Sequence, residues 1–210
     1  MPILELSNIQ HPLGDANARL LSLSSLTIEP ARRLLLIGPS GAGKTTLLNI
    51  MSGLLQPAAG KAQLMGEDYA GINAAARDLL RRQHIGFVFQ KLHLIGHLSA
   101  AENIHLAADI PDHAHIRALM TRMNIADLAQ RKASQLSHGE AQRVAIARAL
   151  SHRPKIVFAD EPTSALDDAH AEAVAKLLMD EAAANGAALV VATHDARLKP
   201  YFDDVMEMAI

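Results

Sequence analysis

The 210-residue chain contains no cysteine. This absence excludes a disulfide framework and a thiolate metal site, and nothing in the composition points to secretion, so we expect a protein of the reducing cytoplasm. An excess of charge of either sign is also lacking, because 20 lysine and arginine residues face 22 acidic ones. The chain therefore has no bulk electrostatic footprint for nucleic acid, and we expect no nucleic-acid partner.

Long hydrophobic runs are missing too. The longest, such as residues 34–37 and 187–192, fall far short of the roughly 20 residues that a helix needs to cross a bilayer. The first residues also lack the cationic start and apolar core of a signal peptide. We therefore expect the protein to reach a membrane only from outside or through a partner.

What the chain does contain is 50% hydrophobic residues, enough for one well-buried core. Short aliphatic and β-branched runs recur between longer Ala- and Leu-rich segments, at residues 34–37, 85–89, 156–159 and 189–192. This pattern predicts an α/β fold with a largely parallel, buried sheet. Strand signals within the first 30 residues bracket a polar stretch and predict an N-terminal antiparallel β subdomain.

A helical pattern without a strand signal runs from about residue 98 to residue 135. We expect a single domain over residues 1–210, with its core at about 1–90 and 137–210 and an inserted helical subdomain at about 91–136. Histidines in and near this insert show no paired ligand spacing with acidic partners, which predicts mostly solvated side chains rather than a metal site. They are His84, His93, His97, His105, His113 and His115.

A glycine-rich loop follows the first run and opens an apolar helix pattern. Its residues are Gly38, Pro39, Ser40, Gly41, Ala42, Gly43, Lys44, Thr45 and Thr46. Strand, loop and helix in this order are the context of a Walker A loop. Its backbone N–H groups would converge on phosphate oxygens, Lys44 would reach the β- and γ-phosphates, and the Thr45 hydroxyl would ligate Mg²⁺. The loop predicts nucleotide binding.

Polar residues end the other three runs. Asp160 and Glu161 follow a buried run, as in a Walker B strand, and because strand neighbours point to opposite sides, Asp160 would face Mg²⁺ while Glu161 serves as general base. His194 would contact the γ-phosphate and position Glu161, at the edge where open α/β sheets bind ligands. Gln90 would meet Mg²⁺ and the attacking water, then release them when its loop moves.

Together these motifs resemble the nucleotide-binding domain of ABC ATPases. The decisive stretch is residues 136–140, Leu-Ser-His-Gly-Glu, which is similar to the ABC signature, with His138 and Glu140 in place of the commoner Gly and Gln. A Ser and a Gly at a helix N-terminus make an anion site. The resemblance implies that Ser137 and Gly139 bind the γ-phosphate of ATP held by the opposite protomer of a head-to-tail homodimer.

Two further positions bear on the resemblance. Residues 162–167 look like the D-loop, which implies that Asp167 helps to couple the two sites across the dimer. The family usually stacks adenine on an aromatic side chain near the end of the first strand, but residues 8–13 contain no Tyr or Phe. Stacking on His11 and packing on Leu13 are both open.

The stretches around Gln90 and over residues 98–104 look like the subgroup of lipoprotein-releasing, macrolide-exporter and cell-division ATPases. This likeness implies an ATPase that powers a separate integral-membrane permease from the cytoplasmic face of the inner membrane. Residues 91–99 would dock the coupling helix of that permease or be plain core. The alternative function is a soluble ABC ATPase of iron–sulfur assembly or of another non-transport role. The subgroup favours export or extraction, and the transported substrate is selected in the permease.

Overall fold

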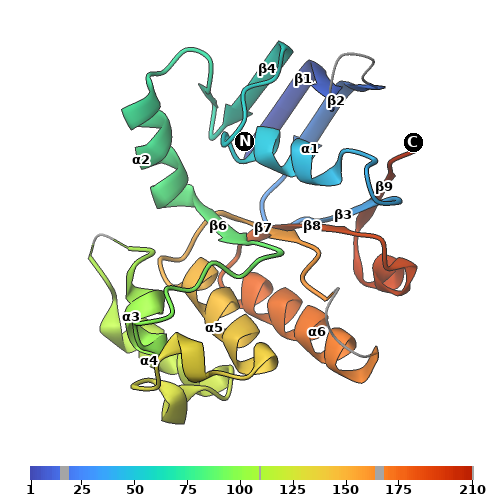
Figure 1. Ribbon diagram of the computed structural model, residues 1–210. Helices are drawn as coiled ribbons and strands as arrows, with labels where there is room; N and C mark the ends of the chain where they lie inside the picture. Colours follow the sequence, from blue (N-terminus) through green and yellow to red (C-terminus); the bar gives the residue numbers. More distant parts are fainter. Residues whose placement is uncertain (15–18, 109, 164–167, 210) are drawn as a thin grey trace.

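The computed structural model describes residues 1–14, 19–108, 110–163 and 168–209. Two sheets and a group of helices are stacked in layers (Figure 1). The antiparallel sheet has the order β2-β1-β4-β5 and consists of β1 (Leu4–Leu13), β2 (Arg19–Ile28), β4 (Ala59–Leu64) and β5 (Glu67–Asp68). The parallel sheet has the order β6-β7-β8-β3-β9 and consists of β3 (Arg33–Ile37), β6 (Ile85–Val88), β7 (Ile156–Asp160), β8 (Ala188–Thr193) and β9 (Asp204–Glu207).

Helices cover both faces of the parallel sheet. The first helix, α1 (Lys44–Met51), lies between the two sheets, and the helices α5 (His138–Leu150) and α6 (Asp168–Ala184) lie on the opposite face (Figure 1). The remaining α-helices are α2 (Ala74–His84), α3 (Ala100–His105) and α4 (His113–Arg122). Short 3₁₀ turns are η1 (Ala126–Leu128), η2 (Ala133–Gln135) and η3 (Ala196–Tyr201).

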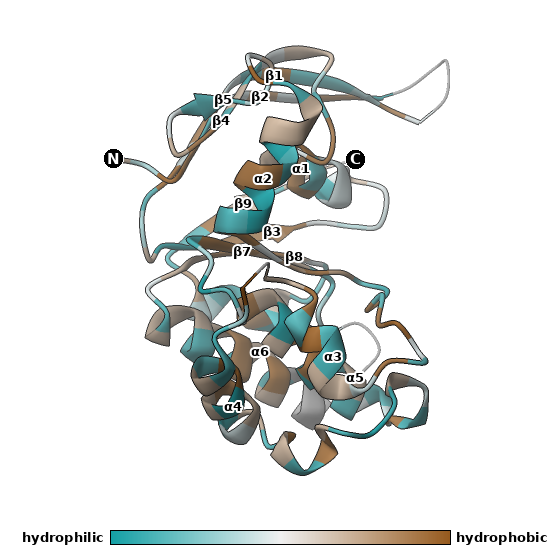
Figure 2. Cartoon of the chain, turned by 90° about the vertical axis from the view of Figure 1, so that its left-hand side faces the viewer, coloured by the Kyte–Doolittle hydropathy of each residue, from teal (hydrophilic) through white to brown (hydrophobic). Residues whose placement is uncertain are grey.

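The parallel strands divide the apolar core into two clusters. In β3, Leu34 and Leu36 pack with α1 and the antiparallel sheet, whereas Leu35 and Ile37 pack with the helices on the other face. Alternation of side chains along a strand produces this split. Because both faces of the sheet are covered, its inner strands are continuously apolar, as the brown band between the layers in Figure 2 illustrates.

The expected α/β architecture with an antiparallel side sheet is confirmed, and the four apolar runs form β3, β6, β7 and β8. Strands β4 and β9 carried no clear signal in the sequence. Both are rich in exposed residues, so neither contains an apolar run. Strand β9 still joins the sheet because its backbone pairs in parallel with β3.

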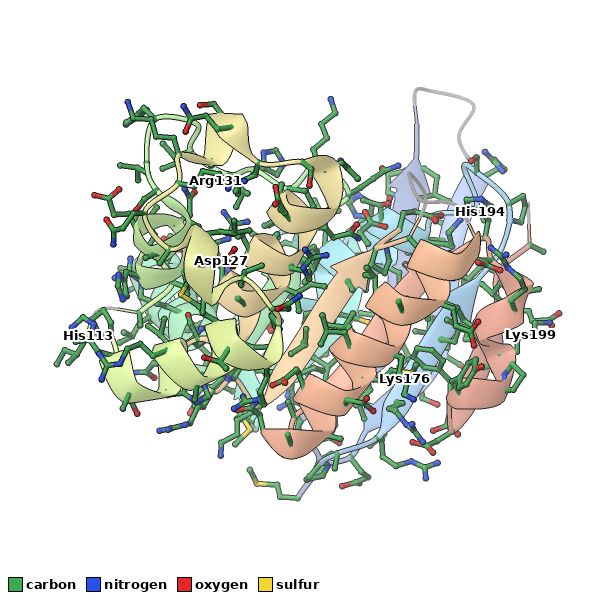
Figure 3. All side chains as sticks on the ribbon, turned by 90° about the horizontal axis from the view of Figure 1, so that it is seen from below. His113, Asp127, Arg131, Lys176, His194 and Lys199 are labelled. Carbon is green, nitrogen blue, oxygen red and sulfur yellow. The ribbon has the colours of Figure 1, made fainter. Side chains whose placement is uncertain are left out.

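The segment between β6 and α5 contains α3, α4, η1 and η2. Ser99 and Glu102 form a capping box on α3, and Asp112 caps α4. Figure 3 shows His113 and Arg131 in this helical part, separated from Lys199 by α6. The boundaries of a helical subdomain at about 91–136 remain a prediction. In the parts of the chain described above, no helix is long and apolar enough to cross a bilayer.

Candidate functional site

The candidate site lies at one edge of the parallel sheet, where the carboxyl ends of β3, β6, β7 and β8 meet. A cavity of about 490 Å³ opens there beside the loop after β3. From the loop and the core it is lined by Ser40, Gly41, Gly43, Lys44, Thr45, Thr46, Leu55, Gln90 and Glu161. From the antiparallel sheet it is lined by His11, Pro12, Leu13, Gly14 and Arg19. The strand order thus gathers side chains from distant parts of the sequence.

Glycines set the shape of the loop between β3 and α1. Gly43 caps α1 in the left-handed region, with φ 93°, and a Cβ there would lie 2.9 Å from the Leu13 side chain. A Cβ on Gly38 would lie 2.2 Å from the Met208 carbonyl oxygen. Larger residues at either position would therefore force the backbone to move. Pro39 and Ala42 also belong to the loop without lining the cavity, and Ala42 is buried.

The Lys44 ammonium is folded back onto its own loop. Its Nζ donates to the carbonyl oxygens of Gly38 at 2.7 Å and Pro39 at 3.2 Å, and it lies 3.5 Å from Oε1 of Glu161. The side chain is 7% exposed, so these oxygens replace water around the charge. A phosphate entering the cavity would offer the same ammonium a stronger anionic partner.

Thr45 and Asp160 form a second contact at the start of α1. The Thr45 hydroxyl donates to Oδ2 of Asp160 at 2.8 Å, while Oδ1 of Asp160 is buried and has no hydrogen-bond partner among the described residues. Burial raises the pKa of the Asp160 carboxyl, and the charge of Glu161 adds to this rise. A buried carboxylate oxygen beside a hydroxyl fits a hard cation with oxygen ligands.

Glu161 is the first residue after β7. Its φ is 46°, in the left-handed region, and its N–H donates to the Ala192 carbonyl at 2.8 Å. The strand therefore ends at Asp160. We expected the two carboxylates to point to opposite sides as neighbours in one strand, but Glu161 is not part of the strand. Its carboxylate lines the cavity, and its Oε2 accepts from Nδ1 of His194 at 3.0 Å. His194 itself is 61% exposed (Figure 3).

Thr193 is a site residue that sequence reasoning missed. It is fully buried at the end of β8. Its Oγ1 donates to Oε2 of Glu161 at 3.1 Å and accepts from the Asp195 N–H at 3.1 Å. A polar residue closing an otherwise apolar strand, directly before His194, was the available signal. The hydroxyl fixes one oxygen of Glu161 and leaves the other toward Lys44.

Replacing Thr193 with Val should therefore lower kcat for ATP hydrolysis about tenfold and leave nucleotide affinity within about twofold, because the carboxylate loses a positioning donor and not a ligand contact. Thr193→Ser, which keeps the hydroxyl, should retain most of the activity. Steady-state kinetics and nucleotide titration measure both. Tyr69→Phe removes a buried hydroxyl that bonds the Met51 carbonyl and does not line the cavity, and it serves as the control. An equal loss in that control would contradict the prediction.

The signature residues stand apart from this cavity. Ser137 caps α5 and forms a capping box with Glu140, whose carboxylate accepts from the Ser137 N–H at 2.7 Å. Neither Ser137 nor Gly139 lines the cavity. A Cβ on Gly139 would meet only the Arg143 guanidinium at 3.7 Å, so among the described residues this helix end faces open space. Their proposed contact with a nucleotide on another protomer remains a prediction.

The D-loop residue Asp167 and the candidates for contact with the base, His11 and Leu13, have different outcomes. Asp167 lies outside the described residues, as does most of the D-loop stretch. The Gln142 side-chain amide donates to the carbonyl of Pro162, the first residue of that stretch. His11 and Leu13 both line the cavity, and Nδ1 of His11 is buried without a partner among the described residues. Both candidates for contact with the base thus line the cavity, and their contact with the base remains a prediction.

Comparison with known proteins adds a family to this geometry. The family model for the ABC transporter matches residues 21–164, more than half of the chain. The macrolide export ATP-binding/permease protein MacB of Rhodopseudomonas palustris is 39% identical over 206 residues, 95% of this chain and 31% of that protein. The chain thus spans about a third of the length of that relative. The lipoprotein-releasing system ATP-binding protein LolD of Shewanella sp. strain MR-4 is 40% identical over 201 residues, 93% of this chain and 87% of that protein.

A solved structure agrees with the sequence relatives. The ATP-binding cassette MJ0796, in a dimeric post-hydrolysis state bound to ADP and Pi, matches with a TM-score of 0.81 and 30% identity over 98% of this chain and 94% of that chain. The glycine loop, the acidic end of β7 and the signature cap occur here in one cassette-like fold. The chain therefore belongs to the ABC transporter family and is an ATP-binding and ATP-hydrolysing cassette of that family.

Proposed function

We propose that the cassette hydrolyses Mg-ATP at the cavity beside α1 and that hydrolysis drives a separate membrane permease. Two neighbouring sets of contacts support this chemistry. Thr45 contacts Asp160, and Glu161 contacts both Lys44 and His194. A cation-binding corner, a phosphate-binding ammonium and a candidate base lie within one cavity edge. Such an arrangement suits phosphoryl transfer by positioning and charge stabilisation.

Mg²⁺ fits the corner formed by the Thr45 hydroxyl and the unpaired oxygen of Asp160. A hard divalent cation prefers oxygen ligands and keeps several waters, so two protein oxygens and the nucleotide phosphates suffice. When bound, the ion would neutralise charge on the phosphates during transfer. Gln90 lines the same cavity with a neutral amide, which suits it to orient a water near this corner.

Glu161 is proposed as the general base. It would accept a proton from the attacking water while the water oxygen bonds to the γ-phosphorus and the bond from that phosphorus to the β-γ bridging oxygen breaks, giving ADP and phosphate. Lys44 would leave the loop carbonyls for the transferred phosphoryl group. Thr193 and His194 hold Oε2 of the carboxylate, and Oε1, which faces Lys44, would accept the proton.

A second copy of the chain completes the proposed site. Ser137 and Gly139 at the start of α5 would bind the γ-phosphate of the partner protomer's ATP, and Asp167 would lie near the same interface. Support comes from the exposed Ser137 cap and from a relative solved as a dimer. ATP would close this head-to-tail homodimer, and hydrolysis would open it.

A groove of about 520 Å³ beside β6 is the proposed docking site for the permease. Apolar and cationic side chains line it, including Leu54, Arg81, Phe87, Phe89, Leu106, Arg148 and His152. Phe89 immediately precedes Gln90, so a partner seated in the groove would touch the strand end that leads into the nucleotide cavity. Residues 91–99, which we expected to dock the permease, follow directly after Gln90 in the chain.

Docking there would place the cassette as a peripheral protein on the cytoplasmic face of the inner membrane. The names of the MacB and LolD relatives favour the transporter interpretation over iron–sulfur assembly. Both names describe export or release, which agrees with the expected direction of transport.

The permease proposal is tested by purifying Glu161→Gln protein with Mg-ATP from detergent-solubilised membranes and identifying stoichiometric partners by mass spectrometry. A polytopic protein with a large extracytoplasmic domain is expected. Adding Leu106→Glu should abolish its recovery, because a charge would enter the groove, whereas the matched Leu20→Glu should not. The two leucines are 57% and 55% exposed, and only Leu106 lines the groove. Recovery of soluble assembly factors alone would overturn the permease proposal and leave the ATPase chemistry intact.

A further inference from the structure

Arg148, near the end of α5, is a half-buried cation that forms no ion pair among the described residues. Its Nη2 donates to the Leu92 carbonyl at 2.6 Å and its Nη1 to the His93 carbonyl at 2.8 Å. In the described parts of the chain no carboxylate contacts it, and burial lowers the pKa of its guanidinium with no opposing charge. Burying a charge is costly unless the charged group is paired or hydrogen-bonded, so the two hydrogen bonds of Arg148 offset part of this cost.

The two carbonyls belong to the loop that leaves the nucleotide cavity. They lie two and three residues after Gln90, and His93 adopts the left-handed region with φ 49°. The His93 ring also meets Phe89 edge-on, with centroids 5.3 Å apart. Arg148 therefore fixes one side of the turn through main-chain atoms while Phe89 holds the other, and Gln90 lies between these two anchors.

Helix α5 is a rigid base for this contact. Its residues Ala145, Ile146 and Ala147 are fully buried between the sheet and the helical segment. Ser137 caps the N-terminus of the same helix, so a displacement of the loop that carries Gln90 would act on the helix that carries the signature. Arg148 also lines the groove proposed for the permease, on the same surface as Phe89.

We propose that Arg148 is a positioning residue that holds the Leu92 and His93 carbonyls and thereby keeps Gln90 in the nucleotide cavity, a role that rests on the function proposed above for Gln90. The planar guanidinium places two N–H donors on two successive carbonyls, which a single ammonium cannot do in the same geometry. Methionine would leave both carbonyls unpaired in a partly buried loop. Lysine would restore one of the two bonds.

The test is a double-mutant cycle of Arg148→Met and Gln90→Ala, with ATPase kinetics and Mg-ATP titration on each protein. Arg148→Met should lower kcat about tenfold with nucleotide affinity within about twofold, and Arg148→Lys should recover part of the loss. In the Gln90→Ala background, Arg148→Met should cost less than about twofold more, because its effect passes through Gln90.

Arg122→Met is the matched control. Arg122 also donates two hydrogen bonds, at 2.7 and 2.8 Å, but to the Glu181 carboxylate on α6 and away from the loop. Its loss leaves a buried carboxylate unpaired, so Tm should fall. Activity of the folded protein should stay unchanged in both Gln90 backgrounds. The control shows what a purely structural arginine does in this cycle.

If Gln90→Ala itself has a lowered kcat, either of two results would overturn the inference. One is wild-type kcat in Arg148→Met, and the other is a loss that is fully additive with Gln90→Ala, which would mean that Arg148 supports the fold only. Wild-type kcat in Gln90→Ala would instead refute the proposed role of Gln90, and the assignment of Arg148 with it. The kinetics of the four proteins distinguish these cases.

Discussion

Replacing Glu161 with Gln is expected to lower kcat for ATP hydrolysis by at least about 100-fold, since an amide cannot accept the proton of the attacking water. The amide has the shape of the carboxylate, and its oxygen can still accept from Thr193 and His194. Nucleotide affinity should therefore stay within about twofold of wild type. Phosphate release under single-turnover conditions and titration with a fluorescent ATP analogue measure the two quantities separately.

The same variant should form a stable dimer. If hydrolysis opens the dimer, a protein that binds Mg-ATP without hydrolysing it should remain closed, and sedimentation should show dimers with Mg-ATP and monomers without it. Glu67→Gln, at an exposed position in β5, is the control for removal of one negative charge. Residual turnover above about a tenth of wild type would refute the assignment of the base.

Replacing Asp160 with Asn is expected to have opposite effects on stability and on activity. Burial disfavours the Asp160 carboxylate, and its Oδ1 has no partner among the described residues. A neutral amide removes that cost and can still accept from the Thr45 hydroxyl. We expect the nucleotide-free variant to be more stable by about 1 kcal/mol, which raises Tm by about 2–4 °C in a protein of this size.

Catalysis should fail in this variant, because Asn supplies a weaker ligand for Mg²⁺. We expect kcat to fall at least about 100-fold, and the rise in Tm that Mg-ATP gives the wild type should largely disappear. Calorimetry with and without Mg-ATP measures both changes. Asp204→Asn, an exposed acid on β9, is the control. An Asp160→Asn protein that is less stable than wild type without nucleotide would contradict the assigned burial cost.

The pH dependence of this difference has a definite sign. A carboxyl whose pKa is raised by folding holds its proton in the native state at pH values where the unfolded chain has already released it. The free energy of unfolding of the nucleotide-free wild type should therefore fall, relative to Asp160→Asn, as pH rises from about 4 through the raised pKa. Denaturant titrations of both proteins at several pH values test this.

Much of the site was predictable because its parts are local in sequence. The loop from Gly38 to Thr46 is one continuous segment, and its glycines, lysine and threonine have the spacing of a Walker A loop. Asp160 was found from two adjacent carboxylates at the end of a buried run, and His194 from the rule that open α/β sheets bind ligands at the carboxyl ends of their strands. The roles of these residues in catalysis remain predictions until the substitutions are measured.

Thr193 and Arg148 were not predictable in the same way. Each acts through a hydrogen bond to a group at least 32 positions away in the chain, at Glu161 and at Leu92 and His93. From the sequence alone, Thr193 is a threonine at the end of a strand and Arg148 is an arginine expected at the surface. Contacts of this kind depend on how packed elements meet, and no local periodicity encodes them.

The sequence by itself determined the α/β class, the phosphate-binding loop and the acidic strand end, because each depends on the alternation or spacing of neighbouring residues. Only the tertiary structure decided the order β6-β7-β8-β3-β9, with the first parallel strand between β8 and β9. It also brought Nε2 of His105 and Nδ1 of His113 within 3.3 Å of each other. Strand order and such contacts arise from how crossover connections pack onto the sheet, a property of the whole chain.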